Sequence, residues 1–298
     1  YTPIICAPSR STLWTIDNRR GPMPGINDFV RVGRAGFQPE GKDCVRMVHV
    51  SDVVRRVDAH PAHLDGLLGQ KVPLFYRSAS KIAEQFGEGF FTAPIADTLH
   101  KLPTSEHFRE SHFGEIAAGV FAEGVLGLRI IYSKLSLLTT GNANPNNMDL
   151  VMYEPGSDPV RFVLGEVKSS MKCAPNDLPA RHHTSCFSSV FQSLSNYDQS
   201  NLDFDLGLVK DRFSDLPEGD RERIRDALKP YGTKVISYAG FCVVDASTVD
   251  CEEASVLATR SNPKDFDVDL VYVEELPSIV DSVYSKLSIL QKAADVFG

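Results

Sequence analysis

Several patterns that assign proteins to large functional classes are missing from this 298-residue chain. It has no apolar run of about 18 residues, the shortest length that crosses a bilayer, so we expect no contact with a membrane. It has no GxxxxGK[ST] phosphate loop, which argues against ATP binding by that route, and no GxGxxG dinucleotide fingerprint. The GxSxG and HExxH motifs are absent too. Most hydrolase chemistries therefore have little support.

Cysteines are few and scattered, and the six in the chain form no CxxC pair. This usage is typical of free thiols in a reducing compartment, so we expect a cytoplasmic protein. The first residues, YTPIICAPSRS, contain no Met and lack the basic and long apolar regions of a signal peptide. We expect a processed or truncated start.

The chain has fewer basic than acidic residues: 31 Lys and Arg against 39 Asp and Glu, which gives a formal net charge of −8. Tight, autonomous and non-specific DNA binding needs several Lys and Arg on one face, so the composition argues against it. It does not exclude a nuclease, because a local basic cleft or a partner protein can hold the DNA.

The most informative stretch is residues 144–168, NPNNMDLVMYEPGSDPVRFVLGEVK. An apolar run at 148–153 is followed by the turn cluster EPGSDP, in which Pro and Gly preset the backbone angles. A second apolar run at 160–167 is interrupted by Gly165 and Glu166. The pattern predicts a β-hairpin.

Charged side chains gather at one end of this hairpin. Successive side chains of a strand alternate between its faces, so Glu166 and Lys168 point the same way. Asp149, near the start of the first strand, can face them from the neighbouring strand. Two carboxylates with an ammonium beside them predict a site for a hard divalent cation such as Mg²⁺.

A metal held by Asp149 and Glu166 would polarise a phosphate and lower the pKa of a bound water. Lys168 would orient that water or offset developing charge, and the Val167 carbonyl is a further candidate ligand. The alternative is a surface hairpin with an ordinary Glu–Lys pair, which stabilises little.

The rest of the second half alternates between helices and strands. The apolar periodicity predicts a helix at 106–126 that contains Glu115, which is either an exposed carboxylate or an acid that reaches the site. Residues 128–138 read as a strand, and 204–211 fit a helix or a strand. Other predicted helices are 184–200, 218–229 and 277–297, and other predicted strands are 234–245 and 267–274.

Basic residues near the predicted site are sparse. Lys134 either faces a phosphate or lies on the exposed face of an edge strand. Lys172 and Arg181 belong to an irregular basic linker at 169–186, which either steers DNA or is a plain solvated loop. These three residues are the candidates for DNA contact.

The first 100 residues carry the least information. Residues 26–33 and 44–50 are predicted strands, 51–60 a short helix with Ser51 as N-cap, 61–73 a loop, and 78–86 a helix. We expect an N-terminal accessory region at 1–100, followed by one catalytic domain at 101–298.

Asp149 followed by Glu166-Val167-Lys168 resembles the D…ExK form of the PD-(D/E)xK nuclease signature. More closely, the chain from about Glu115 to its C-terminus resembles HamA, the nuclease subunit of the Hachiman antiphage defence system. The matching pieces are the Glu-bearing helix, YSKLSLLTTGN, LGEVKSS, a later strand pair, and ELPSIVDSVYSKL. They cover roughly two thirds of the chain.

The resemblance implies a restriction-endonuclease-like α/β fold with an αβββαβ core and a mixed central sheet flanked by helices. It implies a Mg²⁺-dependent deoxyribonuclease, with Mn²⁺ as an alternative metal, in which Asp149 and Glu166 bind the metal and Lys168 activates water. Glu115 is implied to hold a metal-bound water. DNA and a HamB-like helicase subunit, in a heterodimer, are the implied partners.

Two other interpretations stay open. One is a restriction or repair nuclease of the same superfamily. The other is a non-catalytic adaptor that docks a helicase. The intact D…ExK set argues against the adaptor.

Overall fold

The computed structural model describes residues 30–34, 54–59, 64–87, 98–138, 147–171, 186–245, 266–273 and 275–285. Strands from these ranges form one seven-stranded sheet in the order β1-β2-β7-β6-β5-β4-β3. The strands are β1 Val30–Arg34, β2 Val54–Ala59, β3 Arg129–Ser133, β4 Leu150–Tyr153, β5 Val160–Ser170, β6 Lys234–Asp245 and β7 Phe266–Val273.

The sheet is mixed. β3, β4 and β5 form an antiparallel meander, in which Leu150 of β4 lies opposite Gly165 of β5. β5 then pairs in parallel with β6, β6 with β7, and β7 with β2, while β1 runs antiparallel to β2. β5 is therefore the strand at which the meander joins the parallel part of the sheet.

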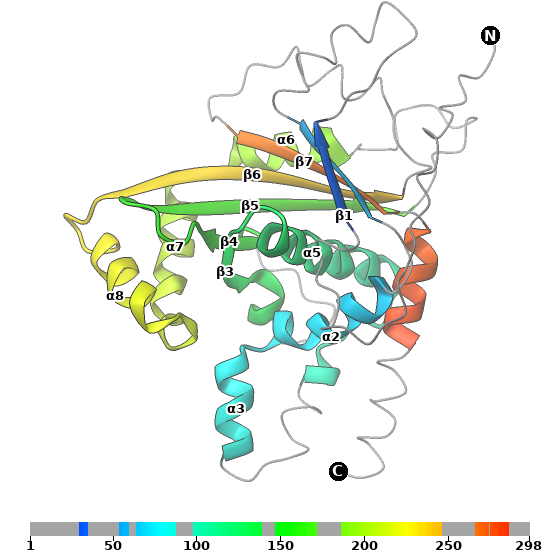
Figure 1. The fold of residues 1–298 in the computed structure, drawn as a ribbon, viewed down its shortest axis with the longest axis horizontal. Coiled ribbons are helices and arrows are strands. Elements are labelled where there is room, and N and C mark those ends of the chain that lie inside the picture. Colours follow the sequence, from blue (N-terminus) through cyan, green and yellow to red (C-terminus); the bar gives the residue numbers. More distant parts are fainter. Residues whose placement is uncertain are drawn as a thin grey trace, which may run out of the picture.

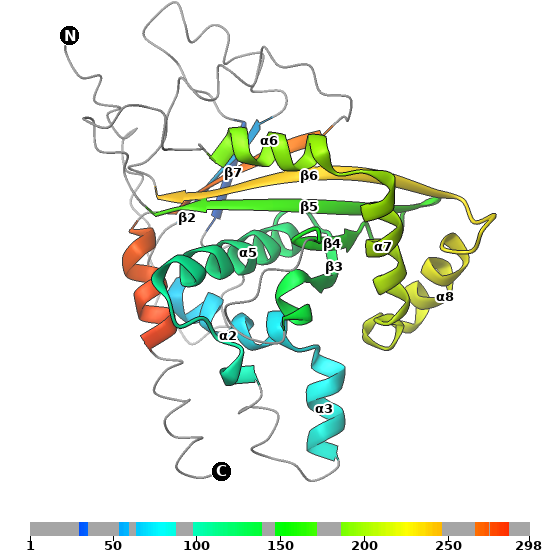
Figure 2. The ribbon, with the colours of Figure 1, turned by 180° about the vertical axis from the view of Figure 1, so that it is seen from behind.

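Helices cover both faces of this sheet (Figures 1 and 2). One face carries α5, Glu106–Gly124, with α2, Leu64–Tyr76, and the helical segment 276–285 beside it. The opposite face carries α6, Cys186–Asn196. The remaining helices are α3 Ala79–Gly87, α7 Gln199–Lys210 and α8 Glu218–Ala227, with short 3₁₀ turns η3 Lys134–Leu137 and η4 Phe213–Asp215.

Two hydrophobic cores, one on each face, explain why the central strands are apolar throughout. On β6, Phe241 and Val243 pack in the core beneath α5, while Cys242 and Val244 pack in the core beneath α6. A strand covered on both faces has no solvent side, so it reads as a continuous apolar run.

The predicted α/β class, with a mixed sheet flanked by helices, is confirmed. The hairpin exists as predicted, with β5 extending a few residues further than expected. Elements that match their predicted ranges within about four residues are α3, α5, α8, β6 and β7.

Two predictions in the N-terminal part are wrong. Residues 54–59, expected in a helix, form β2, because they pair with both β1 and β7 and this pairing overrides the local preference. Residues 64–73, expected in a loop, belong to α2. Its Leu68, Val72 and Phe75 are buried in the core that also contains α5, which outweighs the presence of Pro73.

Two further predictions fail around the second half of the sheet. The predicted helix 184–200 is two helices, because Asp198 caps a new helix by accepting a hydrogen bond from the Asn201 N–H at 2.9 Å. The ambiguous segment 204–211 belongs mainly to this helix, α7. The predicted strand 128–138 ends at Ser133, whose side chain caps the 3₁₀ turn η3.

The predicted accessory region contributes to the same sheet and the same core, since β1 and β2 extend the sheet beyond β7 and α2 packs beside α5. The predicted strand at 44–50 and most of the linker at 169–186 lie outside the described residues. Among the helices in the described ranges, none is long and apolar enough to cross a membrane.

Candidate active site

Side chains from or next to four elements, α5, η3, β4 and β5, meet near the start of β4. They are Glu115 of α5, Lys134 of η3, Asp149 just before β4, and Glu166 and Lys168 of β5. The exposed fractions of these side chains are 4% for Glu115, 15% for Lys134, 3% for Asp149, 11% for Glu166 and 35% for Lys168. A charged cluster this well shielded from water needs compensating contacts.

Asp149 is the most fully engaged of these side chains. Its Oδ2 accepts a hydrogen bond from the Val167 N–H at 2.7 Å, just beyond the last β4–β5 pair. Its Oδ1 forms an ion pair with the Lys134 ammonium, and its backbone carbonyl accepts from the Lys134 N–H at 2.8 Å. Asp149 thus ties β5 and η3 together through three contacts.

Glu166 and Lys168 lie on the same side of β5, as the alternation predicted. The Lys168 Nζ donates to Glu166 Oε1 at 2.6 Å. Burial first, and the negative charge of Asp149 second, raise the pKa of Glu166 to about 7, against the opposing effect of Lys168. Glu166 is therefore poised between its neutral and charged forms near neutral pH.

Glu115 is buried in α5, not exposed on its surface. Its Oε1 lies 3.8 Å from the Lys134 Nζ, while its Oε2 is buried and has no hydrogen-bond partner among the described residues. Burial, and then repulsion from Asp149, raise the pKa of Glu115 well above its ordinary value, against the attraction of Lys134. A buried carboxylate oxygen that accepts no hydrogen bond is unusual in a folded protein, and it fits a site that binds a further group.

Lys134 takes a position that neither of the two sequence-based alternatives foresaw. It lies in η3, with its ammonium inside the carboxylate cluster. Burial disfavours its charge, but attraction by Asp149 and Glu115 outweighs burial and raises the pKa of Lys134 above its ordinary value.

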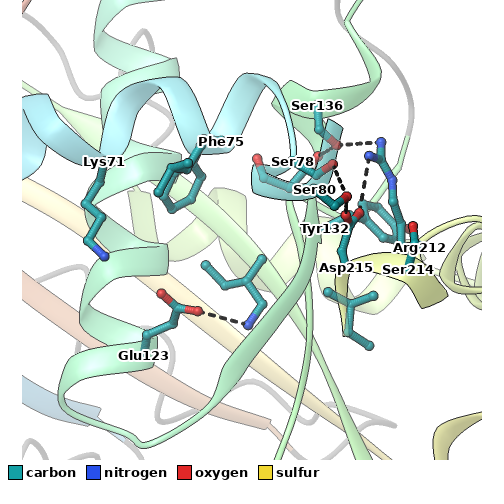
Figure 3. Close-up of a pocket in the computed structure, with 14 residues that line it drawn as sticks. Lys71, Phe75, Ser78, Ser80, Glu123, Tyr132, Ser136, Arg212, Ser214 and Asp215 are labelled. Carbon is teal, nitrogen blue, oxygen red and sulfur yellow. Dashed lines mark hydrogen bonds and ion pairs between the residues drawn. The ribbon is translucent and has the colours of Figure 1, made fainter. Parts of the chain in front are cut away.

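The conformation of η3 explains why Lys134 turns inward. The Ser133 Oγ accepts from the Leu135 N–H at 3.1 Å, and the Ser136 Oγ donates to the Ser133 carbonyl at 2.7 Å. Arg212 then donates to the Ser136 Oγ at 3.1 Å, and both residues line a cavity of about 280 Å³ that residues of α2, β3 and η4 also line (Figure 3). These bonds fix the conformation of the turn.

Two buried polar groups near the cluster were missed by the sequence analysis or given no role. Asp205 of α7 is fully buried and accepts from the Tyr132 and Tyr197 hydroxyls, at 2.8 and 2.6 Å, and from the Met148 N–H at 3.2 Å. It therefore fixes the residue before Asp149. No pattern in the sequence marks an aspartate as buried in a helix that reads equally well as a strand.

The second group is His112, one turn before Glu115 on α5. Its Nδ1 lies 2.7 Å from the Tyr76 hydroxyl of α2. Burial, and then the positive charge of Lys134, lower its pKa to about 4, so it is neutral at neutral pH.

The structure thus brings together Glu115, Asp149, Glu166 and Lys168, with Lys134 added to them. Lys172 and Arg181 lie outside the described residues. Within the described ranges, no three acidic, His or Cys side chains are close enough to hold one metal ion between them. Two carboxylates with an unpartnered Glu115 oxygen nearby fit Mg²⁺, which is bound by one or two carboxylates and keeps several waters.

The sequence model of the HamA family matches residues 37–287, which is most of the chain. The chain belongs to the HamA family. The protein therefore has a role in the Hachiman antiphage defence system. No curated protein matches the chain.

Proposed function

We propose that this HamA-family protein is a metal-dependent deoxyribonuclease that cleaves phosphodiester bonds of DNA. The observation that carries the proposal is the buried cluster of Asp149, Glu166 and Lys168, with Glu115 beside it. Carboxylates at such positions cost folding free energy, and a hard cation bound between them would offset that cost.

The order of the elements supports the same reading. α5, β3, β4, β5, α6 and β6 occur in the αβββαβ order of the PD-(D/E)xK nucleases, to which the motif is similar, with α7 and α8 inserted between α6 and β6. In that comparison Glu115 is on the first helix, Asp149 at the second strand, and Glu166 and Lys168 on the third. Four chemically relevant residues therefore fall on the corresponding elements.

The residues have distinct roles in the proposed reaction. Asp149 and Glu166 would hold Mg²⁺ or Mn²⁺, which when bound polarises the phosphate and acidifies a water. Lys168, the more exposed ammonium, orients the attacking water and balances charge that develops at phosphorus. Glu115 accepts a hydrogen bond from water at the site through its unpartnered Oε2.

The net charge of −8 indicates how the substrate arrives. A chain of this charge does not attract DNA over long distances, which favours a partner that holds the duplex near the site. Family membership supports a HamB-like helicase as that partner, with the two subunits forming a heterodimer on phage or damaged DNA.

The test is cleavage of supercoiled and linear plasmid with Mg²⁺ or Mn²⁺, with and without the helicase and ATP. Wild type is compared with Glu166→Ala/Lys168→Ala and with Lys229→Ala, whose surface ion pair with Asp226 lies away from the site. We expect cleavage by wild type and Lys229→Ala and none by the double variant. Cleavage by the double variant at the rate of wild type would contradict the assignment of the active site. No cleavage by any protein, with the helicase complex still formed, would favour a docking adaptor.

A further inference from the structure

Lys134 has a position that the proposed nuclease mechanism does not use. Its ammonium contacts Asp149 Oδ1 and lies 3.8 Å from Glu115 Oε1. The Asp149 Oδ2 is already bonded to the Val167 N–H at 2.7 Å. Both oxygens of Asp149 are therefore engaged by the chain itself.

Each carboxylate oxygen keeps a further lone pair, but a cation bound at Oδ1 would meet the positive charge of the Lys134 ammonium, and that repulsion favours departure of the ammonium. The Val167 N–H belongs to the backbone of β5, which is held in place at this position by its pairing with β6, so it cannot turn away. Lys134 contacts Oδ1 through a flexible four-carbon side chain, so its ammonium is the donor that can leave.

The structure also contains a place for the released ammonium. The Glu115 Oε1 already lies 3.8 Å from the Lys134 Nζ, which leaves the unpartnered Oε2 of the same carboxylate for the water of the proposed mechanism. A short movement of the side chain would exchange the ion pair with Asp149 for one with Glu115, while the backbone of η3 stays fixed by Ser133 and Ser136.

We propose that Lys134 is an internal counter-ion that competes with the divalent cation for Asp149 and transfers to Glu115 when the cation binds. This inference rests on the proposed metal-dependent function and deepens it. Lys134 stabilises the carboxylate cluster before the metal arrives, and it lowers metal affinity because its ammonium repels a cation at Asp149. Lys168 differs from Lys134 because it is more exposed and pairs with Glu166 instead of Asp149.

The test is titration calorimetry of Mn²⁺ into the full chain, with the melting temperature measured in EDTA and in Mn²⁺. Lys134→Met removes the ammonium, and Lys134→Gln removes the charge but keeps a hydrogen-bond donor. We expect both variants to bind Mn²⁺ about tenfold more tightly than wild type, the order for one released charge-assisted hydrogen bond. In EDTA both should melt below wild type, and Mn²⁺ should raise their melting temperatures by more than it raises that of wild type.

Lys229→Met is the matched control, since Lys229 also pairs with an aspartate, at 2.6 Å, but on the surface. Its Mn²⁺ affinity should stay within about twofold of wild type. If Lys134→Met fails to fold in EDTA, Lys134→Gln carries the comparison. Unchanged or weaker Mn²⁺ binding by the Lys134 variants would overturn the counter-ion proposal.

The outcomes separate this inference from the function on which it rests. If wild type binds Mn²⁺, Asp149→Asn does not, and Lys134→Gln binds it as tightly as wild type does, the counter-ion role alone would be overturned. Absence of Mn²⁺ binding in wild type and in all variants would overturn the counter-ion role and the metal-dependent function together.

Discussion

At the scale of single residues, the site concentrates three carboxyl groups and two ammonium groups where little water reaches them. Each group is held by a specific partner, except for one oxygen of Glu115. Burial raises the pKa of both Glu115 and Glu166, so the charged form of the site is costly to maintain. Such cost is typical of positions retained for chemistry.

His112 makes the stability of the protein sensitive to acid. Its pKa is lowered to about 4 by burial and by Lys134, whereas in the unfolded chain it has the ordinary value of 6.5. Between these values the unfolded chain binds a proton that the folded protein does not, so stability falls as the pH drops from 6.5 to 4. The loss is on the order of 3 kcal/mol at most, from about 1.4 kcal/mol per pKa unit.

The check is urea unfolding of wild type and His112→Gln between pH 4 and pH 7, with EDTA present. Gln keeps an acceptor for the Tyr76 hydroxyl but does not titrate. The free energy difference between the two proteins should shift in favour of His112→Gln as the pH falls. A difference that stays constant across this range would contradict the assigned pKa.

The residues that a short motif names could be predicted, and those that depend on three-dimensional neighbours could not. Asp149, Glu166 and Lys168 followed from strand alternation and a nuclease-like spacing. Lys134 was recognised as a candidate, but its inward position depends on the Ser133 cap. Asp205 carries no local signal, because its partners lie 8, 57 and 73 residues away.

At the scale of the elements, α5 is the helix on which the site depends, and it packs closely against its neighbours. An added Cβ at Gly119 would lie 2.5 Å from ring atoms of Phe75 in α2 and 2.8 Å from Ile130 in β3. Gly207 on α7 has no atom within 4 Å of the corresponding position. Substitution of each glycine by Ala therefore separates the effect of packing on stability from the effect of helix propensity.

We expect Gly207→Ala to stabilise the protein by about 0.5–1 kcal/mol, since Ala favours a helix over Gly and nothing obstructs it. Gly119→Ala has the same propensity gain but overpacks the core, so it should destabilise by about 1–3 kcal/mol. Thermal or urea unfolding measures both. Stabilisation by Gly119→Ala would show that α5 and α2 are packed less closely than described.

Asp205 links α7 to the start of β4. Asp205→Ala leaves two buried tyrosine hydroxyls and the Met148 N–H without their acceptor, so we expect a loss of about 3–5 kcal/mol. Asp203→Ala, on the same helix, removes only an exposed bond from Gln199 and should change stability by less than about 0.5 kcal/mol.

Unfolding curves and plasmid cleavage by both variants provide the measurement. Because Met148 precedes Asp149, Asp205→Ala should also reduce cleavage under conditions in which the protein remains folded. Equal stability of the two variants would mean that Asp205 does not position the start of β4.

Elements with a clear period could be predicted, whereas elements defined by their neighbours could not. β6 and β7 are long apolar runs, and α5 has a helical repeat, so their sequences were sufficient. β2 is a strand because β1 and β7 lie on either side of it, and α2 is a helix because its apolar side chains fill the core under α5. Neither reason is visible within a short window of sequence.

At the scale of the whole molecule, the part before residue 100 is joined to the remainder through the sheet and the core. β2 pairs with β7 along the whole length of β2, and Leu68, Val72, Phe75 and Tyr76 of α2 are buried with residues of α5. Removing residues 1–100 would expose one edge of β7 and one side of α5.

We therefore expect a fragment of residues 101–298 to be insoluble, or to lack cooperative unfolding, when it is made alone. Co-expression with a fragment of residues 1–100 should recover soluble protein, because the lost surfaces are then covered. Circular dichroism and thermal unfolding report the outcome. A soluble 101–298 fragment with a sharp transition would show that the first 100 residues form a separable accessory region.

The central claim is that Asp149 and Glu166 bind a divalent metal for phosphodiester cleavage. The most direct measurement is an anomalous difference map from a crystal of the full chain grown with Mn²⁺. The account predicts a peak bonded to carboxylate oxygens of Asp149 and Glu166, with the Lys134 ammonium moved away from Asp149. A map with no peak at these residues, or with Mn²⁺ bound only elsewhere on the chain, would contradict the assignment.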